Sequence, residues 1–462
     1  MMNSVEIPVW VLILVGVLAA IAALERFLLP SMRWYLRRRM EKVVSKLNDR
    51  LERPIEPFKL YRRHDMIQRL IYDPAVFEAI QDHAHEEGVP ENVAFEMAHR
   101  YAREIVPSFS ASLYFGFAIK LARAVSTMLY RVRLGHYDEA AIKAIDKDAT
   151  VVFVINHRSN MDYFLVTYLA AERSALSYAV GEWARVWPLK SFIRAMGAYF
   201  IRRKSRNMLY RRVLARYVQM ATKGGVTQAV FPEGGLSLDG SVKPPKLGIL
   251  SYVLTAAEDN PEGDVVFVPV AVNYDRVLED RVLIEAAELG ERKFKFHIFA
   301  MLGFIGRQIK FKLMGRYHRF GYAAVSFGNP LSVNAFQAAN PNLRNEAIGR
   351  ELMTRIKDVV PVLPVPLVAH ILMGAEQGLK KSEIEAQLVD MVATLRATKA
   401  HVHLPRDNTS YATTVGLRML RLRHFVSETG DANDPIYQIA KENRAQVAYY
   451  ANSIAHLLPK SA

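Results

Sequence analysis

The sequence predicts an α/β domain flanked on both sides by helical regions, with an apolar segment at the N-terminus. Within residues 150–330, short apolar, β-branched runs (151–155, 226–231, 265–272 and 323–327) alternate with longer helical patterns, which indicates an α/β domain. Before and after it, apolar residues recur at helical spacing. We therefore expect four parts: residues 1–30, 31–110, 111–335 and 336–462.

Residues 7–24 form an uncharged apolar run of about the length that a membrane-crossing helix requires. Six basic residues follow it: Arg26, Arg33, Arg37, Arg38, Arg39 and Lys42. The positive-inside rule places such a flank in the cytoplasm. We therefore expect a transmembrane anchor within residues 1–30, with a buried or interfacial helix as the alternative.

The charge balance indicates an anionic partner. The chain has 61 Lys and Arg against 46 Asp and Glu, a formal net charge of +15, which suits nucleic acid, a membrane surface or phosphorylated substrates. It has no cysteine, which excludes disulfides, Cys-ligated metals and an acyl-cysteine intermediate. A serine, a histidine or direct transfer must carry any group-transfer chemistry.

Residues 113–133 carry apolar side chains at steps of four and several basic ones elsewhere, which predicts a basic amphipathic helix. Such a helix can lie on anionic lipid or pack against a core, and both alternatives stay open.

Further along, residues 359–367 (VVPVLPVPL) carry repeated prolines, which we expect to prevent a regular helix.

The first motif lies in residues 151–165 (VVFVINHRSNMDYFL), where an apolar run ends and a helix is expected to begin at Ser159 or Asn160. His157 in the turn and Asp162 in the first helical turn can then approach each other. Asp162 would hold the imidazole in one tautomer, which leaves the other nitrogen to take a proton from a hydroxyl. Open α/β sheets bind ligands at this edge. The alternative is that both residues only cap a helix.

The second motif lies in a basic stretch. Residues 183–232 hold eleven Lys or Arg and no Asp or Glu. Within it, Arg202, Arg203 and Lys204 follow the apolar segment 197–201, and guanidinium groups suit bidentate phosphate contacts. A solvated basic face is the alternative. Nucleic acid is not expected, because a recognition helix and an RNA-binding signature are missing.

The third motif, FPEGGLS at residues 231–237, follows an apolar run, and its two glycines permit a tight turn whose N–H groups could face a phosphate or an oxyanion. Glu233 beside it would bind a cation or a substrate hydroxyl. The segment does not match Gly-x-Ser-x-Gly, which disfavours a serine hydrolase. An ordinary Gly-Gly turn is the alternative.

The fourth motif, VPVAVNY at residues 268–274, is by itself a core strand.

In this order, NHRSNMD, GAYFIRR, FPEGG and VPVAVNY resemble the four blocks of the glycerolipid acyltransferases, and most closely the bacterial membrane-bound glycerol-3-phosphate acyltransferases, over residues 110–335. The resemblance implies an acyltransferase domain with a central mixed sheet flanked by helices. It also implies roles for the motif residues: His157 and Asp162 in catalysis, Arg202 and Arg203 at the acceptor phosphate, Glu233, Gly234 and Gly235 in the acceptor site, and Pro269 with the acyl donor.

One departure from the family pattern concerns the acceptor. The family has arginines after the two glycines, where this chain has Leu236 and Leu238. Lys243 and Lys246 could replace them, or the acceptor could be the monoacylated form. Arg158 and Lys246 complete the set of predicted substrate-binding residues.

The expected function is transfer of a fatty acyl group from acyl-CoA or acyl carrier protein to the sn-1 hydroxyl of glycerol 3-phosphate, in phospholipid biosynthesis. The reaction needs no metal or other cofactor. Membrane lipids are the further expected partner, and the expected location is the cytoplasmic face of the bacterial inner membrane. The alternatives are acylation of 1-acylglycerol 3-phosphate at sn-2, and a non-catalytic membrane-tethered protein that binds anionic lipid or nucleic acid.

Overall fold

The computed structural model describes residues 8–24, 53–290 and 317–459, except for 171–174, 182–188, 203–204 and 261–262, together with scattered positions in 35–51 and 303–315. By its packing the chain divides into two units, Met1–Ile55 and Glu56–Ala462. Each unit is described by itself. The division into four parts at residues 30, 110 and 335 stays a prediction.

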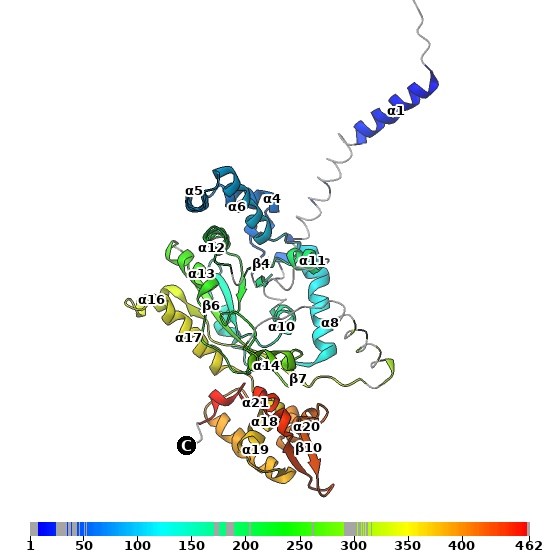
Figure 1. Ribbon diagram of the computed structural model, residues 1–462, viewed down its shortest axis with the longest axis vertical. Helices are drawn as coiled ribbons and strands as arrows, with labels where there is room; N and C mark the ends of the chain where they lie inside the picture. The colour runs from blue at the N-terminus through cyan, green and yellow to red at the C-terminus, as the bar shows by residue number, and fades with distance from the viewer. Residues whose placement is uncertain are drawn as a thin grey trace, which may run out of the picture. The chain divides into compact units, whose positions relative to one another are not determined.

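The first unit contains helix α1 (Val9–Ala23), drawn in blue in Figure 1. Its 15 residues span about 22 Å at 1.5 Å per residue, which is less than the ~30 Å hydrocarbon core of a bilayer. Among the described residues, no helix combines the length and the apolar character needed to cross a membrane. The transmembrane anchor predicted within residues 1–30 is therefore not supported.

The second unit is built around an eight-stranded sheet, as the alternating pattern predicts. The strands run in the order β1-β7-β6-β2-β5-β3-β4, and β8 pairs with β6. β2 is parallel to both neighbours, whereas β7 is antiparallel to β6, so the sheet is mixed. The strands are β1 (Arg131–Leu134), β2 (Thr150–Ile155), β3 (Ser177–Val180), β4 (Tyr199–Phe200), β5 (Gln228–Val230), β6 (Val265–Tyr274), β7 (Tyr322–Phe327) and β8 (Leu331–Ser332).

Both faces of this sheet are covered, which explains why its central strands are apolar without interruption. From β2, Val152 and Val154 join the core formed with α12 and α13, whereas Phe153 and Ile155 join the core formed with α8 and α10. Figure 1 shows these helices around the sheet. The helices of this part are α3 (Pro57–Leu60), α4 (Arg63–Ile71), α5 (Pro74–Glu86), α6 (Glu91–Ile105), α7 (Ala111–Leu113), α8 (Ile119–Leu129), α9 (Glu139–Lys143), α10 (Met161–Ala170), α11 (Leu189–Ala195), α12 (Met208–Lys223), α13 (Gly248–Glu258), α14 (Asp280–Glu288), α16 (Val333–Ala339) and α17 (Asn345–Asp358).

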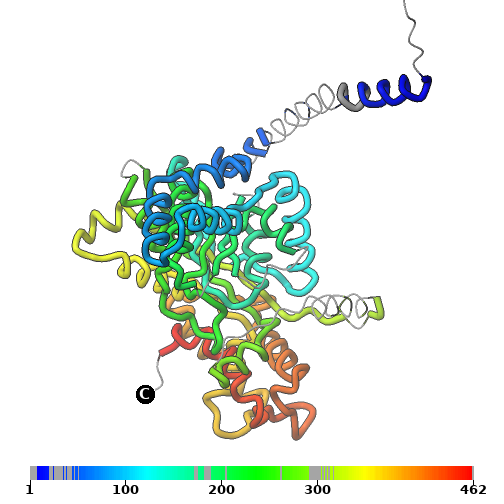
Figure 2. The backbone as a smooth tube through the Cα atoms, turned by 45° about the horizontal axis from the view of Figure 1, so that its top comes forward, coloured from blue at the N-terminus to red at the C-terminus, as the bar shows by residue number. Residues whose placement is uncertain are grey.

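The C-terminal region, orange to red in Figure 2, lies at one end of the second unit. Leu367 and Tyr450 belong to the same core cluster as Phe153, so this region shares its core with the sheet. It comprises α18 (Pro364–Gly374), α19 (Lys381–Ala397), α20 (Thr409–Arg421) and α21 (Arg444–Ala451), with an antiparallel sheet of β9 (Leu379–Lys380), β11 (Ile436–Ile439) and β10 (Val426–Thr429).

The single helix predicted over residues 113–133 is wrong at its C-terminal end. A π-helical segment (Tyr114–Ala118) precedes α8, which ends at Leu129. Arg131 and Arg133 then lie in β1, which pairs with β7 in parallel. Pairing with β7 and the alternation of Arg-Val-Arg-Leu favour a strand over another helical turn.

The expectation that proline prevents a helix in residues 359–367 is wrong for the last four residues. Helix α18 begins at Pro364, so Pro364 and Pro366 lie in its first turn. N–H groups of the first turn have no partner within the helix, and a proline there removes no hydrogen bond. The first hydrogen bond of α18 joins Leu367 N to Leu363 O at 3.2 Å.

Replacing Gly416 in α20 with alanine should destabilise the fold. A Cβ there would lie 2.6 Å from Val368 Cγ2 and 2.8 Å from Pro364 O, both in α18. We expect a loss of about 1–3 kcal/mol in the free energy of unfolding from overpacking, measured by urea denaturation. Gly374→Ala is the control, because a Cβ at that helix end has nothing within 4 Å. Equal stability of the two variants would contradict this account of α18–α20 packing.

Candidate active site

The side chain of Asn156 terminates strand β2, which leads into the site. Its Nδ2 donates to Val272 O at 3.1 Å, and its Oδ1 accepts from Val272 N at 2.7 Å. The side-chain amide thus pairs with both backbone groups of Val272, which a continued strand β2 would otherwise do. As a result the backbone leaves the sheet at His157 while the strand end stays fixed.

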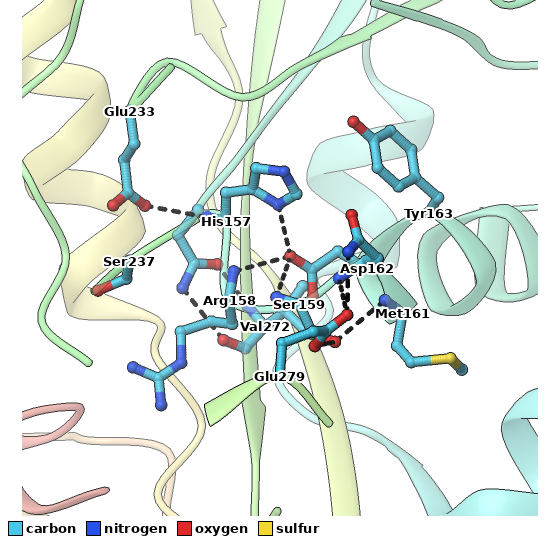
Figure 3. Close-up of polar contacts among 12 residues, drawn as sticks. His157, Arg158, Ser159, Met161, Asp162, Tyr163, Glu233, Ser237, Val272 and Glu279 are labelled. Carbon is cyan, nitrogen blue, oxygen red and sulfur yellow. Dashed lines mark hydrogen bonds and ion pairs between the residues drawn. The ribbon is translucent and has the colours of Figure 1, made fainter. Parts of the chain in front are cut away.

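His157 and Asp162 meet beyond the end of β2, as the first motif predicts. Nδ1 of His157 lies 2.9 Å from Oδ2 of Asp162, which is in the first turn of α10. Figure 3 shows the two side chains pointing toward each other. Both are buried, with 1% and 0% of their surface exposed. The interpretation that they only cap a helix does not explain this side-chain pairing.

The carboxylate of Asp162 is held by donors on both oxygens. Oδ2 also accepts from the backbone N–H of Arg158 at 2.8 Å and of Ser159 at 3.0 Å, and Oδ1 accepts from the Tyr274 hydroxyl at 2.5 Å. Burial and the nearby charge of Asp162 raise the pKa of Tyr274 well above its ordinary value, so this hydroxyl stays a donor. An acceptor facing Nδ1 favours the tautomer that carries its proton there, which leaves Nε2 as the basic nitrogen.

Tyr274 closes the fourth motif, which the sequence interpretation assigned only to the core and, through Pro269, to the acyl donor. In the structure the motif is a fully buried core strand, as predicted, and its last residue also positions the acid of the dyad. Pro269 itself is buried in β6 beside Val154, and its predicted link to the acyl donor stays a prediction.

Two aromatic side chains enclose the imidazole. The ring of Phe231 stacks on it with centroids 4.1 Å apart, and Tyr163 meets it edge-on at 5.7 Å. Because His157 is only 1% exposed, a substrate can reach the ring only if a neighbouring side chain moves.

Glu279 is a site residue that the sequence interpretation missed, since it lies outside all four motifs. It accepts from Ser159 Oγ at 2.7 Å, from Asn160 N at 3.2 Å and from Asn160 Nδ2 at 3.0 Å. It therefore holds the turn that separates His157 from Asp162. Burial raises the pKa of its carboxyl, against the opposing effect of these hydrogen bonds.

Glu233 supports the backbone of the site. Its side chain is 4% exposed, accepts from His157 N at 2.9 Å and accepts from Lys243 N at 3.2 Å. Burial raises its pKa to about 7, although both hydrogen bonds and the charge of Arg158 act in the opposite direction. These contacts are with the chain itself, and the contact of Glu233 with a cation or substrate hydroxyl stays a prediction.

The backbone geometry of the turn after Glu233 requires a glycine at position 234. Its φ is +70°, and an added Cβ would lie 2.9 Å from Cδ of Lys246, which packs over it. The N–H of Gly234 donates to Phe231 O at 3.1 Å. This N–H is thus part of the turn and is not directed at an oxyanion. Gly235 is buried beside it, and Lys246 is exposed.

Arg158 follows His157 in the chain, and its guanidinium group is buried against another part of the fold. It is 2% exposed, donates through one NH group to Gly240 O, and lies 5.0 Å from the centre of the Tyr449 ring. Figure 3 shows its side chain pointing away from the imidazole of His157. Its Nε and NH2 atoms are buried and have no hydrogen-bond partner among the described residues, which is costly for N–H groups. The contact of Arg158 with an anionic substrate stays a prediction.

Arg202, which follows β4, is paired with an acid of the N-terminal helices. Its Nε and NH2 atoms pair with Glu104 of α6 at 2.9 and 2.6 Å, and its guanidinium lies 5.1 and 5.3 Å from the rings of Tyr101 and Tyr210. The hydrogen bond to Glu104 raises the pKa of Arg202. A phosphate would have to compete with Glu104 for this side chain. Arg203 lies outside the described residues.

Other cations of the basic stretch are also paired with acids from elsewhere in the chain. Arg216 meets Asp73 at 2.7 Å, and Lys223 meets Asp259 at 3.1 Å. The stretch is therefore less uniformly cationic in the fold than in the sequence.

The two leucines that depart from the family pattern have a structural role. Leu236 and Leu238 are partly buried and pack against the large core cluster that includes Phe153. Lys243, considered above as a substitute cation, is paired with Asp239 at 2.5 Å.

Among the described residues, no group of three or more His, Asp or Glu side chains could hold a metal ion.

The sequence of this chain matches two family models and several curated proteins. Residues 138–273 match the acyltransferase family model, and residues 311–462 match the model of the glycerol-3-phosphate acyltransferase C-terminal region. The chain is similar to proteins named glycerol-3-phosphate acyltransferase from Aeromonas hydrophila, Pseudomonas fluorescens and Shewanella loihica, at 29%, 29% and 28% identity over 86% of the chain. The resemblance predicted from the four motifs is confirmed.

These relatives are longer proteins: the alignments cover 50%, 48% and 51% of their length, so the chain spans about half of each. Among solved structures, the chain is similar to the 1-acyl-sn-glycerophosphate acyltransferase from Thermotoga maritima. That match has 19% identity and a TM-score of 0.33, and it covers 53% of this chain and 79% of the other.

Replacing Glu279 with glutamine should change how stability depends on pH. A folded-state pKa above the ordinary value of 4.5 means that the folded chain holds this proton to higher pH than the unfolded chain. The carboxyl therefore contributes most to stability at low pH, and this contribution is lost as pH rises through the folded pKa. The unfolding free energy of Glu279→Gln relative to wild type should thus increase between about pH 4 and pH 8.

Urea denaturation at several pH values measures this trend. Glu86→Gln, at an exposed position in α5, is the matched control and should show no such increase. A flat difference for Glu279→Gln would mean that burial does not shift this carboxyl.

Proposed function

We propose that this chain, which carries an acyltransferase domain followed by a glycerol-3-phosphate acyltransferase C-terminal region, transfers a fatty acyl group from acyl-CoA or acyl carrier protein to the sn-1 hydroxyl of glycerol 3-phosphate. The observation that carries the proposal is the buried hydrogen bond between His157 Nδ1 and Asp162 Oδ2 at the edge of the sheet. The names of the relatives support the choice of acceptor.

In the proposed reaction, Nε2 of His157 takes the proton of the acceptor hydroxyl while the oxygen attacks the thioester carbonyl carbon. Asp162 stabilises the imidazolium that forms. The tetrahedral intermediate collapses with cleavage of the C–S bond, and the imidazolium returns the proton to the leaving thiolate. No step requires a metal ion or another cofactor.

The anionic groups of both substrates suit the cations near the site. The buried nitrogens of Arg158 lack partners among the described residues and support binding of the acceptor phosphate, with Arg202, Arg203 and Lys246 as further predicted contacts. CoA carries phosphates and acyl carrier protein is acidic, so a net charge of +15 favours encounter with either donor at low salt.

Replacing His157 with alanine should lower kcat about 100- to 10,000-fold, the usual contribution of general base catalysis. Release of CoA from a labelled acyl thioester measures the rate, and thermal unfolding checks the fold. Phe231→Leu is the matched control, because it removes the stacked ring but keeps the base. Undiminished transfer by the alanine variant would exclude His157 as the base.

Variants of the Arg202–Glu104 pair separate a substrate contact from a structural ion pair. If Arg202 also binds the acceptor phosphate, Arg202→Ala should raise the acceptor KM about 10- to 100-fold, equivalent to ~1.5–3 kcal/mol for a charged hydrogen bond. Glu104→Ala removes the same ion pair but no cation, so it should leave this KM unchanged or lower it. An unchanged acceptor KM in Arg202→Ala would exclude the phosphate role.

An acceptor panel tests the function as a whole. Detergent-solubilised protein is incubated with labelled acyl-CoA or acyl carrier protein and with glycerol 3-phosphate or its 1-acyl form. Acylation of glycerol 3-phosphate alone is expected. Preference for the 1-acyl form would favour the sn-2 alternative, which Leu236 and Leu238 support, and no transfer to either would favour the non-catalytic, membrane-tethered protein.

The proposed location is the cytoplasmic face of the bacterial inner membrane, where the lipid product partitions. The apolar helix α1 and the six basic residues between Arg26 and Lys42 support association with anionic lipid. Deleting residues 1–42 should move the protein from the membrane fraction to the supernatant. An unchanged distribution would show that this segment does not mediate attachment.

A further inference from the structure

A cavity of about 330 Å³ lies between the β1–β7 edge of the sheet and the C-terminal region. The strands contribute Arg131, Arg133 and Tyr322. The chain leading into α20 contributes His403 and Arg406, and the first turn of α20 contributes Tyr411. None of these residues belongs to the four motifs or to the site around His157. The volume is at the lower end of the range for ligand pockets, about 300–1,000 Å³.

The described side chains that line the cavity include three arginines and no acidic residue. Three guanidinium groups converge on it, and no carboxylate is among the described residues that line it. The neighbouring Asp407 is paired with Arg396 at 2.7 Å. Beneath the cavity, Asp275 is buried and accepts from Tyr322 N at 2.7 Å and from Val365 N at 2.9 Å. Burial raises the pKa of Asp275 to about 7, against the opposing effect of these two hydrogen bonds and of the charge of Arg131.

Aromatic rings, not acids, position the three guanidinium groups. Arg131 and Arg133 lie on the same side of β1, and both are within 5.6 Å of the centre of the Tyr322 ring. Arg406 lies 4.5 Å from the centre of the Tyr411 ring. Stacking on a ring occupies the face of a guanidinium and leaves N–H groups at its edge for an anion.

His403 adds a polar atom that needs a partner. Its Nε2 is buried and has no hydrogen-bond partner among the described residues, and its ring lies 5.2 Å from that of Tyr322. Burial and the charge of Arg133 lower the pKa of His403, which favours the neutral imidazole. An Nε2–H group could then donate to an anion without adding another fixed charge.

The chain around Arg406 is held in an unfavourable conformation. Arg406 and Asp407 have φ values of +59° and +48°, in the left-handed region that residues with a Cβ seldom adopt. Such strain persists only where the surroundings enforce it. Here it presents the Arg406 side chain to the cavity opposite β1.

We propose that this cavity is a phosphate-binding site, formed jointly by the β1–β7 edge and the C-terminal region. The forked geometry of arginine suits bidentate contacts with phosphate oxygens, and three arginines can neutralise one or two phosphoryl groups. The phosphate can belong to a soluble compound or to a phospholipid headgroup. The inference does not rest on acyl transfer, because no residue of the dyad takes part.

Binding of pyrophosphate and of lipid vesicles to the purified full chain tests the proposal. Isothermal titration calorimetry measures pyrophosphate binding, and co-sedimentation compares phosphatidylglycerol with phosphatidylcholine vesicles. Arg131→Ala/Arg133→Ala should weaken binding of at least one anionic probe ten-fold or more. Both arginines are exposed, so the fold should be retained, which thermal unfolding checks. The control Arg350→Ala/Arg418→Ala removes the same charge at exposed positions outside the cavity.

A selective loss of pyrophosphate binding in the cavity variant would support a soluble phosphorylated ligand. A loss restricted to phosphatidylglycerol vesicles would support a lipid headgroup. Arg131→Lys/Arg133→Lys keeps the charge but not the fork, and should bind more weakly than wild type. Equal binding by the cavity variant and the control, for both probes, would overturn the proposal.

Discussion

The arrangement of the site depends on the carboxylate of Asp162. Donors reach it from two parts of the chain: the imidazole and backbone N–H groups of residues 157–159, and the hydroxyl of Tyr274 at the end of β6. Because Asp162 itself lies in the first turn of α10, its carboxylate joins this helix to the segment after β2 and to β6. The hydrogen bonds of this one carboxylate therefore both orient the imidazole of His157 and fix the turn between β2 and α10.

Two further carboxyls show how a mostly apolar interior supports such a site. Glu233 and Glu279 have raised pKa values, so their burial costs free energy in the charged form. Both accept hydrogen bonds from groups adjoining the dyad, Glu233 from His157 N and Glu279 from Ser159 and Asn160. Their contacts hold the backbone around the dyad in place, which is the preorganisation that the proposed acyl transfer would require.

The excess of positive charge is distributed unevenly once the chain is folded. Arg202, Arg216 and Lys223 from the basic stretch are paired with acids distant in sequence, whereas two buried nitrogens of Arg158 have no hydrogen-bond partner in the part of the chain that the structure describes. At the β1–β7 edge, Arg131 and Arg133 are positioned by an aromatic ring instead. Pairing with distant acids, and not the local density of basic residues, therefore decides where an anion can bind.

Local patterns in the sequence determined the strands that lead into the site and the residues of the dyad. Short, continuous β-branched runs indicate strands covered on both faces. His157 and Asp162 are near each other because the turn between them is short. The tertiary structure alone decided the roles of Glu279, Tyr274 and Glu104, because each acts on a residue far from it in the chain. It also placed Arg131 and Arg133 in a strand, since pairing with β7 outweighs their helical spacing. Long-range hydrogen bonds and ion pairs leave no periodic trace in a sequence, and only the folded chain shows which of them form.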